Sequence, residues 1–212
     1  MRDVMGQFRR RWDCLWKGAG GPGLGCEQLL AQYAQPWRHY HDAGHIVACL
    51  EELEEYRAAG GMALRALELA IFFHDAVYDP RRHDNEEQSV RLAEEVLAPV
   101  VSSGELADVR LLILATRHEQ LPTAADEMLV ADVDLAILGK GEAEFAAYER
   151  GIRAEYRLVP EEQFRAGRMA VLRRFLERQQ IYSTEYCRRR YEEAARGNLT
   201  RAIAKLTGMT DA

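Results

Sequence analysis

Apolar residues recur at the spacing of an α-helix along almost the whole chain. In residues 45–56, Ile46, Leu50 and Leu53 fall on one stripe, and glutamates occupy most of the opposite face. The sequence contains no convincing period-two run of β-branched and aromatic residues, which would predict a strand. The spacing therefore predicts an all-α protein, with helices over 45–56, 62–73, 127–138, 142–156, 161–179 and 185–206.

Local signals mark where some helices begin or end. Asp84 and Ser102 are each followed three positions later by a glutamate, which is the pattern of a capping box, so each predicts a helix that starts directly after it. Glycines at 60–61 end the helix that precedes them, and Gly197 is a candidate point of interruption in the last helix.

Length and composition indicate one folded domain. The 212 residues are 48% hydrophobic and 29% charged, without low-complexity blocks or an excess of glycine or proline. A Gly-rich stretch at 18–25 separates an N-terminal amphipathic segment from the rest. We expect residues 1–25 to form an N-terminal helix and a connection, and residues 26–212 to form a helical domain with the C-terminal helices packed on it.

The charge of the chain restricts its partners. A formal net charge of −6 argues against binding to a nucleic-acid polymer, which requires a basic surface. The longest apolar runs are far shorter than the roughly 20 residues of a membrane-spanning helix. The start of the chain does not resemble a secretory signal, and the four cysteines lack CxxC spacing. We therefore expect a cytoplasmic protein without nucleic-acid or membrane partners.

The histidines and the negative charge share one part of the chain. All six histidines lie between residues 39 and 118. Residues 1–149 carry 14 Lys and Arg against 26 Asp and Glu, a net charge of −12, whereas residues 150–212 carry 14 against 8, a net charge of +6. Part of this acidity is best interpreted as cation-binding groups, because carboxylates and imidazoles are common metal ligands.

The doublet His74-Asp75 directly follows the apolar run 67–73. Burying an imidazole and a carboxylate at this point is unfavourable unless a partner compensates, and a divalent metal ion would do so. Upstream, His41 and His45 stand four residues apart, on one face of a helix. The three histidines and the aspartate are therefore candidate metal ligands.

Two further carboxylates, Asp132 and Asp134, interrupt an apolar stretch later in the chain. Side chains two residues apart on a helix point about 200° away from each other. Only one of the two aspartates can therefore face the same site as the histidines.

Six segments of the chain, taken in order, resemble the HD superfamily of metal-dependent phosphohydrolases. They are RHYHDAGHI (38–46), FFHDAVYDP (72–80), DNEEQS (84–89), ATRHE (115–119), VADVDLAILG (130–139) and ARGNL (195–199). The similarity is closest to an uncharacterised bacterial branch of predicted HD phosphohydrolases and covers roughly residues 28–208. An HD dipeptide alone has little specificity, but ordered elements on the expected helices are fairly specific.

The resemblance implies an HD-domain helical bundle that holds one divalent metal ion through His41, His74, Asp75 and Asp132. Because these ligands offer nitrogen and oxygen but no thiolate, Mn²⁺, Fe²⁺, Co²⁺, Ni²⁺ or Mg²⁺ would suit them better than structural zinc. The implied function is hydrolysis of a small phosphorylated compound, with nucleotides as the foremost candidates.

The resemblance also implies roles for carboxylates and a histidine near these ligands. His45 and Asp134 would either support the ligands or hold a second metal ion. Close relatives often carry a glutamate a few residues after the HD doublet, where this chain has Asp79 instead. Asp75 and Asp79 are therefore candidate catalytic carboxylates, although an aspartate before proline is also common in turns. Glu86 is a third candidate, because the capping box of Asp84 and Glu87 leaves it free to face the cleft.

Arg38, Arg117 and His118 are the candidate contacts to substrate phosphate. A guanidinium group pairs with two phosphate oxygens at once, which explains the choice of the two arginines. Each arginine has the alternative of pairing with one of the many carboxylates of the chain. His118 has two alternatives, as a ligand of a second metal ion and as a polar cap at a helix end.

Two other functions stay open at the level of the sequence. The chain could be a non-catalytic metal- or nucleotide-binding module, which the missing glutamate after the HD doublet favours. It could also perform an oxygen-dependent reaction at two metal ions, which would require His45 or His118 as a ligand of the second ion.

Overall fold

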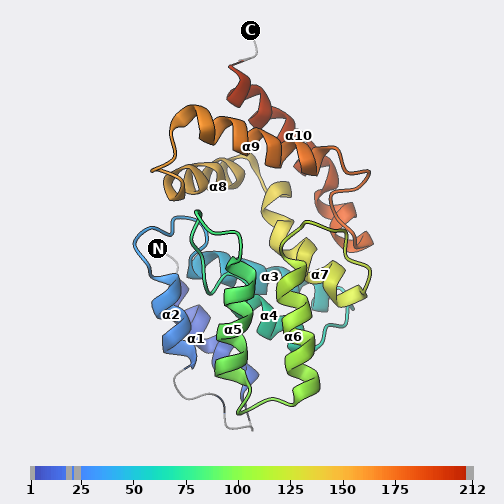
Figure 1. Ribbon diagram of the computed structural model, residues 1–212. Helices are drawn as coiled ribbons and strands as arrows, with labels where there is room; N and C mark the ends of the chain where they lie inside the picture. Colours follow the sequence, from blue (N-terminus) through green and yellow to red (C-terminus); the bar gives the residue numbers. More distant parts are fainter. Residues whose placement is uncertain (1–2, 18–20, 22–24, 209–212) are drawn as a thin grey trace.

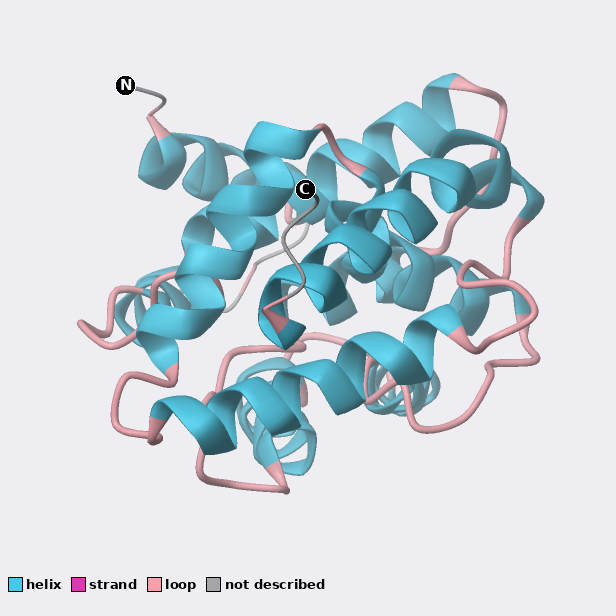
Figure 2. Ribbon diagram, turned by 90° about the horizontal axis from the view of Figure 1, so that it is seen from above, coloured by secondary structure: helices cyan, strands magenta, loops and turns pink. Residues whose placement is uncertain are grey.

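The computed structural model describes residues 3–17, 21 and 25–208. These residues form α-helices and one 3-10 helix, and no β-strand occurs among them (Figure 2). The elements are α1 (Val4–Leu15), α2 (Gly25–Tyr33), α3 (Ala43–Ala58), α4 (Arg65–Phe73), α5 (Asn85–Leu97), α6 (Ser103–Ala115), α7 (Ala125–Asp134), η1 (Leu135–Gly139), α8 (Glu142–Glu155), α9 (Glu161–Leu176) and α10 (Glu185–Thr207). The predicted all-α class is confirmed.

The two predicted capping boxes differ in the structure. The Ser102 hydroxyl accepts a hydrogen bond from the Glu105 N–H at 3.1 Å and caps α6, as predicted. Asp84 does precede α5, but its side chain makes no capping bond. Arg82 and Gln88 instead donate to its carboxylate, so the expected Asp84 cap is wrong although the helix starts where the sequence indicates.

Other helix boundaries also depart from the sequence pattern. The predicted helix over 127–138 is α-helical only to Asp134 and then continues as η1, whose tighter winding redirects the following side chains. The interruption expected at Gly197 is absent, since α10 runs through this residue without a break. The helix predicted to start at Met62 begins at Arg65.

The first group of helices, α1 to α7, packs around α4 (Figure 1). All but two residues of α4 are buried, which explains why its sequence is apolar on every side. From α1, Phe8 and Trp12 pack edge-on against Phe72, with ring centroids 4.9 and 5.2 Å away. The N-terminal helix is therefore part of this core, whereas residues 18–20 and 22–24 of the Gly-rich stretch lie outside the described residues.

The second group consists of η1 and α8 to α10, which share their own apolar cluster. Asn198, buried in α10, anchors that helix to η1 by donating to the carbonyls of Leu138 and Lys140 at 2.8 and 2.9 Å. In Figure 1 this group lies above the first one, with α7 and η1 leading from one group to the other.

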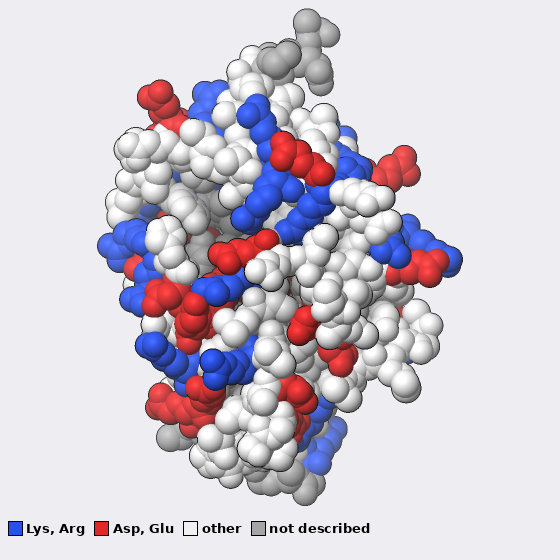
Figure 3. Space-filling view, turned by 45° about the vertical axis from the view of Figure 1, so that its right-hand side comes forward, with Lys and Arg blue, Asp and Glu red and all other residues white. Residues whose placement is uncertain are grey.

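Two observations concern the outer surface. None of the helices in the described ranges is both long and apolar enough to cross a membrane. On the face shown in Figure 3, Lys and Arg side chains are interspersed with Asp and Glu side chains over most of the surface.

Candidate metal centre

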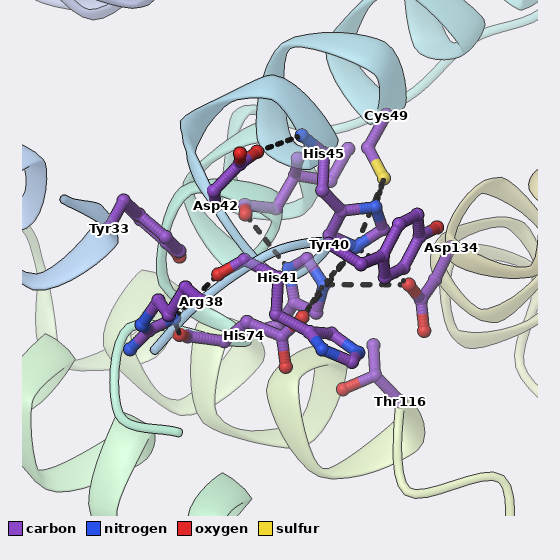
Figure 4. Close-up of polar contacts among 12 residues, drawn as sticks. Tyr33, Arg38, Tyr40, His41, Asp42, His45, Cys49, His74, Thr116 and Asp134 are labelled. Atoms are coloured by element: carbon purple, nitrogen blue, oxygen red, sulfur yellow. Dashed lines mark hydrogen bonds and ion pairs between the residues drawn. The ribbon is translucent and has the colours of Figure 1, made fainter. Parts of the chain in front are cut away.

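Four side chains from three separate segments meet at the boundary between the two groups of helices. His45 lies in the first turn of α3, His74 and Asp75 directly follow α4, and Asp134 ends α7. Figure 4 shows His45, His74 and Asp134 directed toward a common point. We call these four residues, His45, His74, Asp75 and Asp134, the His/Asp cluster. The tertiary fold brings together ligand types that the sequence separates by up to 89 positions.

Local structure sets the direction of each histidine. The Asp42 carboxylate caps α3 by accepting hydrogen bonds from the Gly44 and His45 N–H groups at 2.7 and 3.3 Å. At the end of α4, the His74 N–H still donates to the Ala70 carbonyl at 2.8 Å, so the imidazole is held against the last helical turn. Both histidines are buried, with exposed fractions of 6% and 2%.

The ligand atoms of the cluster lie close together. His45 Nε2 is 3.1 Å from His74 Nε2, 3.0 Å from Asp134 Oδ1 and 3.6 Å from Asp75 Oδ2. His74 Nε2 is 3.2 Å from Asp75 Oδ2 and 3.5 Å from Asp134 Oδ1. Atoms about 2.1 Å from one metal ion lie about 3.0 Å apart at right angles and about 3.4 Å apart at tetrahedral angles. The observed separations match those of ligands around a single ion.

Protons cannot satisfy all of these contacts. His74 Nδ1 lies 2.9 Å from the Ile71 carbonyl, to which it donates, so in the neutral imidazole Nε2 carries the lone pair that faces the cluster. A proton on His45 Nε2 can point at only one of its three neighbours, and protons on both Nε2 atoms would face each other across 3.1 Å. A cation would satisfy every lone pair at once, and the cluster could therefore hold a metal ion.

The carboxylates of the cluster are held in their charged forms. Burial acts to raise the pKa of Asp75, but protonated His74 and His41 outweigh burial and bring that pKa below its usual range. Asp75 and Asp134 in turn raise the pKa of His74, so a proton on His74 provides the positive charge that a metal ion would replace. Burial acts in the same way on Asp134, and hydrogen bonds from His118, His45 and His74 outweigh it, so its pKa is also lowered. Two anionic carboxylates beside two imidazoles favour a divalent cation.

Cys49 is a neighbour of the cluster, one helical turn beyond His45 in α3. Its Sγ lies 3.8 Å from His45 Nδ1, and His45, Cys49 and Asp134 form a second group that could bring three ligand atoms together. Burial raises the pKa of the Cys49 thiol well above its ordinary value, so the sulfur stays protonated at neutral pH. The His/Asp cluster is the stronger candidate, because four nitrogen and oxygen ligands converge in it, whereas the second group adds the thiol to only one imidazole and one carboxylate.

The structure corrects the choice between the two aspartates. Asp132, which the resemblance suggested as a ligand, points away from the cluster toward the start of α10. Its carboxylate accepts hydrogen bonds from the Ser183 N–H at 2.8 Å and from the Thr184 N–H and hydroxyl, both at 2.6 Å. Asp132 therefore connects α7 to the N-terminus of α10. Asp134 occupies the position in the cluster that the resemblance assigned to Asp132.

His41, the other histidine suggested as a ligand, is replaced in the cluster by His45. His41 Nδ1 donates to Glu155 Oε2 at 2.7 Å, and its ring stacks on Tyr78 with centroids 4.1 Å apart. Burial acts to lower the pKa of His41, but Asp75 and Glu155 outweigh it and raise that pKa. His41 is therefore a neighbour of Asp75 that favours the protonated form, rather than one of the four clustered ligands.

Glu155 is a residue of the site that the sequence did not reveal. Its Oε1 accepts hydrogen bonds from the backbone N–H groups of His39, Tyr40 and His41 at 2.8 to 2.9 Å. The close approach requires Gly151 one turn earlier in α8, where a Cβ would lie 3.0 Å from the His39 carbonyl oxygen. One signal was present, because a glutamate in the last turn of a helix opposes the helix dipole and requires a compensating partner.

Arg38, predicted to hold substrate phosphate, has a structural role instead. It is 6% exposed, and its guanidinium group donates to the carbonyls of His41, Asp75 and Ala76 at 2.9, 2.6 and 2.9 Å. The Gln35 side chain accepts from its Nε at 3.0 Å. Because these bonds use most of its donors, Arg38 connects the segment before α3 to the HD doublet and cannot also clamp a phosphate group.

We expect Arg38→Ala to lower the free energy of unfolding by about 2 kcal/mol, because one buried and two part-buried carbonyls lose a charged donor. Arg38→Lys should restore little of this stability, since a single ammonium group cannot reach three carbonyls with the geometry of a guanidinium fork. Urea denaturation of both variants measures the effect. Wild-type stability in Arg38→Ala would show that these bonds contribute nothing net.

Two other predicted substrate contacts are already paired in the structure. Arg117 forms ion pairs with Glu87 and, more loosely, with Glu86, whose Oε2 lies 3.7 Å from Arg117 Nε. His118 Nε2 donates to Asp134 Oδ2 at 2.7 Å, and the His118 carbonyl accepts from Arg178 at 2.6 Å. His118 has a left-handed backbone with φ of 56°, which is unfavourable for a residue with a side chain. Through its hydrogen bond, His118 orients the Asp134 carboxylate of the cluster.

The two remaining candidate carboxylates differ in their surroundings. Arg81 binds both oxygens of Asp79 at 2.9 and 2.7 Å in the turn after the HD segment and lowers the Asp79 pKa to about 2. Asp79 is therefore neutralised by Arg81. Burial, together with the charge of Asp75, raises the pKa of Glu86. The negative charge of Asp75 therefore acts on Glu86, whose carboxyl group takes up a proton more readily than that of an ordinary glutamate.

Comparisons with protein-family models, curated proteins and solved structures found no significant match to this chain. The His/Asp cluster supplies two nitrogen and two oxygen ligands and could hold a metal ion. Beside it lies His41, whose Nδ1 donates to Glu155, and the charge of Asp75 contributes to the raised pKa of Glu86.

Proposed function

We propose that the chain is a metal-dependent phosphohydrolase of the HD type that hydrolyses a phosphate ester of a small molecule, most plausibly a nucleotide. The observation that carries the proposal is the convergence of two imidazoles and two carboxylates at 3.0 to 3.6 Å, with the His74 lone pair directed into the cluster. The segments that supply them are the ones whose sequences resemble the HD superfamily, RHYHDAGHI, FFHDAVYDP and VADVDLAILG.

A divalent ion held by the cluster would neutralise charge that develops on a phosphoryl group and lower the pKa of a water molecule. Nitrogen and oxygen ligands without thiolate suit Mn²⁺, Fe²⁺, Co²⁺, Ni²⁺ or Mg²⁺. The two carboxylates of the cluster carry a formal charge of −2, which such an ion balances. An anionic phosphate ester can therefore approach although the chain as a whole is acidic.

Residues beside the cluster supply the rest of the proposed chemistry. The His41 Nδ1–H donates to Glu155. When the His41 imidazole is protonated, its Nε2–H is available to donate to a phosphoryl oxygen. Glu86, with 26% of its side chain exposed, can hold a proton at its carboxyl group and pass it to the departing alcohol.

A second candidate function is binding of a metal ion or a phosphorylated ligand without turnover. The observation that favours it is the pairing of Asp79 with Arg81, because the carboxylate that follows the HD doublet is then engaged away from the cluster. The two candidates differ only in whether phosphate is released.

The test is phosphate release from a panel of phosphate esters and nucleotides, with metal-free protein reloaded with Mn²⁺, Co²⁺, Ni²⁺ or Mg²⁺. We expect metal-dependent hydrolysis that disappears in Asp75→Asn and His74→Ala, with metal content reduced from about one ion per chain. His83→Ala is the matched control, because His83 is exposed and lies outside the cluster. Folded, metal-loaded protein that releases no phosphate from any ester would overturn hydrolysis and leave the binding function.

A further inference from the structure

A cavity of about 330 Å³ lies between α3, η1 and α8 and reaches the His/Asp cluster from one side. His45 and Asp134 line this cavity, whereas His74 and Asp75 do not. Cys49, one helical turn after His45, lines it as well. His45 and Asp134 therefore present a second side, which faces Cys49 and open space.

The sulfur of Cys49 lies at the distance of a common metal ligand from His45. Its Sγ is 3.8 Å from each ring nitrogen of His45, and His45 Nε2 is 3.0 Å from Asp134 Oδ1 (Figure 4). A zinc ion holds sulfur at about 2.3 Å and imidazole nitrogen at about 2.1 Å, which places these two atoms about 3.6 Å apart at tetrahedral angles. His45, Cys49 and Asp134 could therefore hold one ion.

The position of Cys49 on α3 supports this ligand set. His45 and Cys49 stand four residues apart, the spacing at which two zinc ligands on one helix share a face. Both side chains are buried, and the remaining contact of the thiol is a long one, to the Val133 carbonyl at 3.9 Å. Little protein structure therefore has to be broken for the sulfur to bind an ion.

The charges that line the cavity favour a cation. They are Asp42, Glu52, Asp134 and Glu144 against Lys140. Lys140 pairs with Glu52, so the charge of the other three carboxylates is not balanced by this lysine. A Cys49 thiolate and the Asp134 carboxylate would together carry a charge of −2, which a divalent ion neutralises.

We infer that Cys49, His45 and Asp134 form a second metal site, selective for thiophilic divalent ions such as Zn²⁺ and Cd²⁺. Thiolates select such ions, whereas Mn²⁺ and Mg²⁺ prefer oxygen ligands. As the sulfur–metal bond forms, the thiol proton passes to solvent. Three protein ligands leave a fourth position of the ion open toward the cavity. The inference does not require the chain to hydrolyse a phosphate ester.

The second site and the His/Asp cluster exclude each other. Both use His45 Nε2, which lies 3.0 Å from Asp134 Oδ1 and 3.1 Å from His74 Nε2. An imidazole nitrogen has a single lone pair and binds one ion at a time. Zn²⁺ on the Cys49 side should therefore displace Mn²⁺ from the cluster.

X-ray absorption spectroscopy at the zinc edge tests the ligand set on the unmodified chain, loaded with one equivalent of Zn²⁺. We expect one sulfur neighbour at about 2.3 Å, beside nitrogen and oxygen neighbours at about 2.0–2.2 Å. A shell of nitrogen and oxygen alone would overturn the inference.

Cys49→Ser identifies the sulfur, with Cys187→Ser as the matched control, because Cys187 is also buried but belongs to α10. Titration with Cd²⁺ is followed through the ultraviolet sulfur-to-metal charge-transfer band. Wild type and Cys187→Ser should show the band, and Cys49→Ser should lose it and bind Cd²⁺ at least about a hundredfold more weakly. The affinity for Mn²⁺ should be equal in all three. A band that persists in Cys49→Ser, or a parallel loss of Mn²⁺ affinity, would overturn the second site.

Competition tests the shared nitrogen. Zn²⁺ is added to Mn²⁺-loaded wild type, and released Mn²⁺ is measured by electron paramagnetic resonance. We expect one Mn²⁺ to leave for each Zn²⁺ bound, and Mn²⁺ that stays bound beside Zn²⁺ would overturn mutual exclusion. His74→Ala should lose Mn²⁺ binding but keep the Cd²⁺ band, since His74 lies outside the second group. None of these measurements depends on phosphate release, so they stay decisive if the proposed hydrolysis fails.

Discussion

Asp134→Asn should bind Mn²⁺ or Co²⁺ at least about a hundredfold more weakly than the wild-type chain. Asp134 Oδ1 lies 3.0 Å from His45 Nε2, and its Oδ2 accepts a hydrogen bond from His118 at 2.7 Å, so the amide disturbs a ligand and the residue that orients it. Loss of an outer hydrogen-bond partner alone lowers metal affinity about 10- to 100-fold, and loss of a ligand charge has a larger effect. Titration calorimetry on metal-free protein measures the change.

Asp132→Asn is the matched control, since it makes the same chemical change two residues away. It should leave metal affinity unchanged and lower the free energy of unfolding by about 1–3 kcal/mol. An amide cannot accept on both sides, and Asp132 accepts from the Ser183 N–H and from two groups of Thr184. Loss of metal binding in Asp132→Asn, with retention in Asp134→Asn, would restore the assignment that the resemblance suggested.

Glu155→Ala should lower the free energy of unfolding by about 3–5 kcal/mol, the range for breaking a buried charge pair. The substitution removes the acceptor of three backbone N–H groups in the segment 39–41 and the carboxylate partner of His41. Urea denaturation at neutral pH measures the loss. Glu142→Ala is a control on the same helix, because Glu142 is exposed in the first turn of α8 and lies far along the helix from Glu155.

The stabilising effect of Glu155 should also depend on pH. Hydrogen bonds from His41 and the backbone outweigh the effect of burial and lower the pKa of Glu155 from 4.5 to about 2. A lowered pKa in the folded state stabilises the fold above the unfolded value, near pH 4.5, and this stabilisation is lost as the pH falls toward 2. The stability difference between wild type and Glu155→Gln should therefore shrink over this range. A difference that stays constant would contradict the pairing.

The helices were largely predictable because their signals are local. Apolar spacing decides which face of a segment can be buried, and the Ser102 cap forms within one helical turn. The predicted helix caps and boundaries were wrong where another side chain or a tertiary contact competed with the local signal. Arg82 binds the Asp84 side chain that was expected to cap α5, and the apolar stretch after Asp134 tightens into η1 where it packs against α10.

The identity of the cluster residues depended on the fold. His41 and His45 stand four residues apart, and the sequence does not indicate which of them joins the cluster. In the fold, the carboxylate of Glu155, 114 residues after His41, binds His41, and His45 faces His74. Asp132 and Asp134 differ only in which neighbour they face, the start of α10 or the first turn of α3. Neither neighbour can be inferred from the spacing of the aspartates.

The amino-acid sequence by itself determined an all-α fold and a set of buried imidazoles and carboxylates that require a compensating charge. These properties follow from hydrophobic periodicity and from the free energy of burying polar groups, both of which act over a few residues. Only the tertiary structure decided which side chains converge, because His45, His74 and Asp134 meet through the packing of α3, α4 and α7. Contacts between distant segments depend on the whole core, which local patterns do not specify.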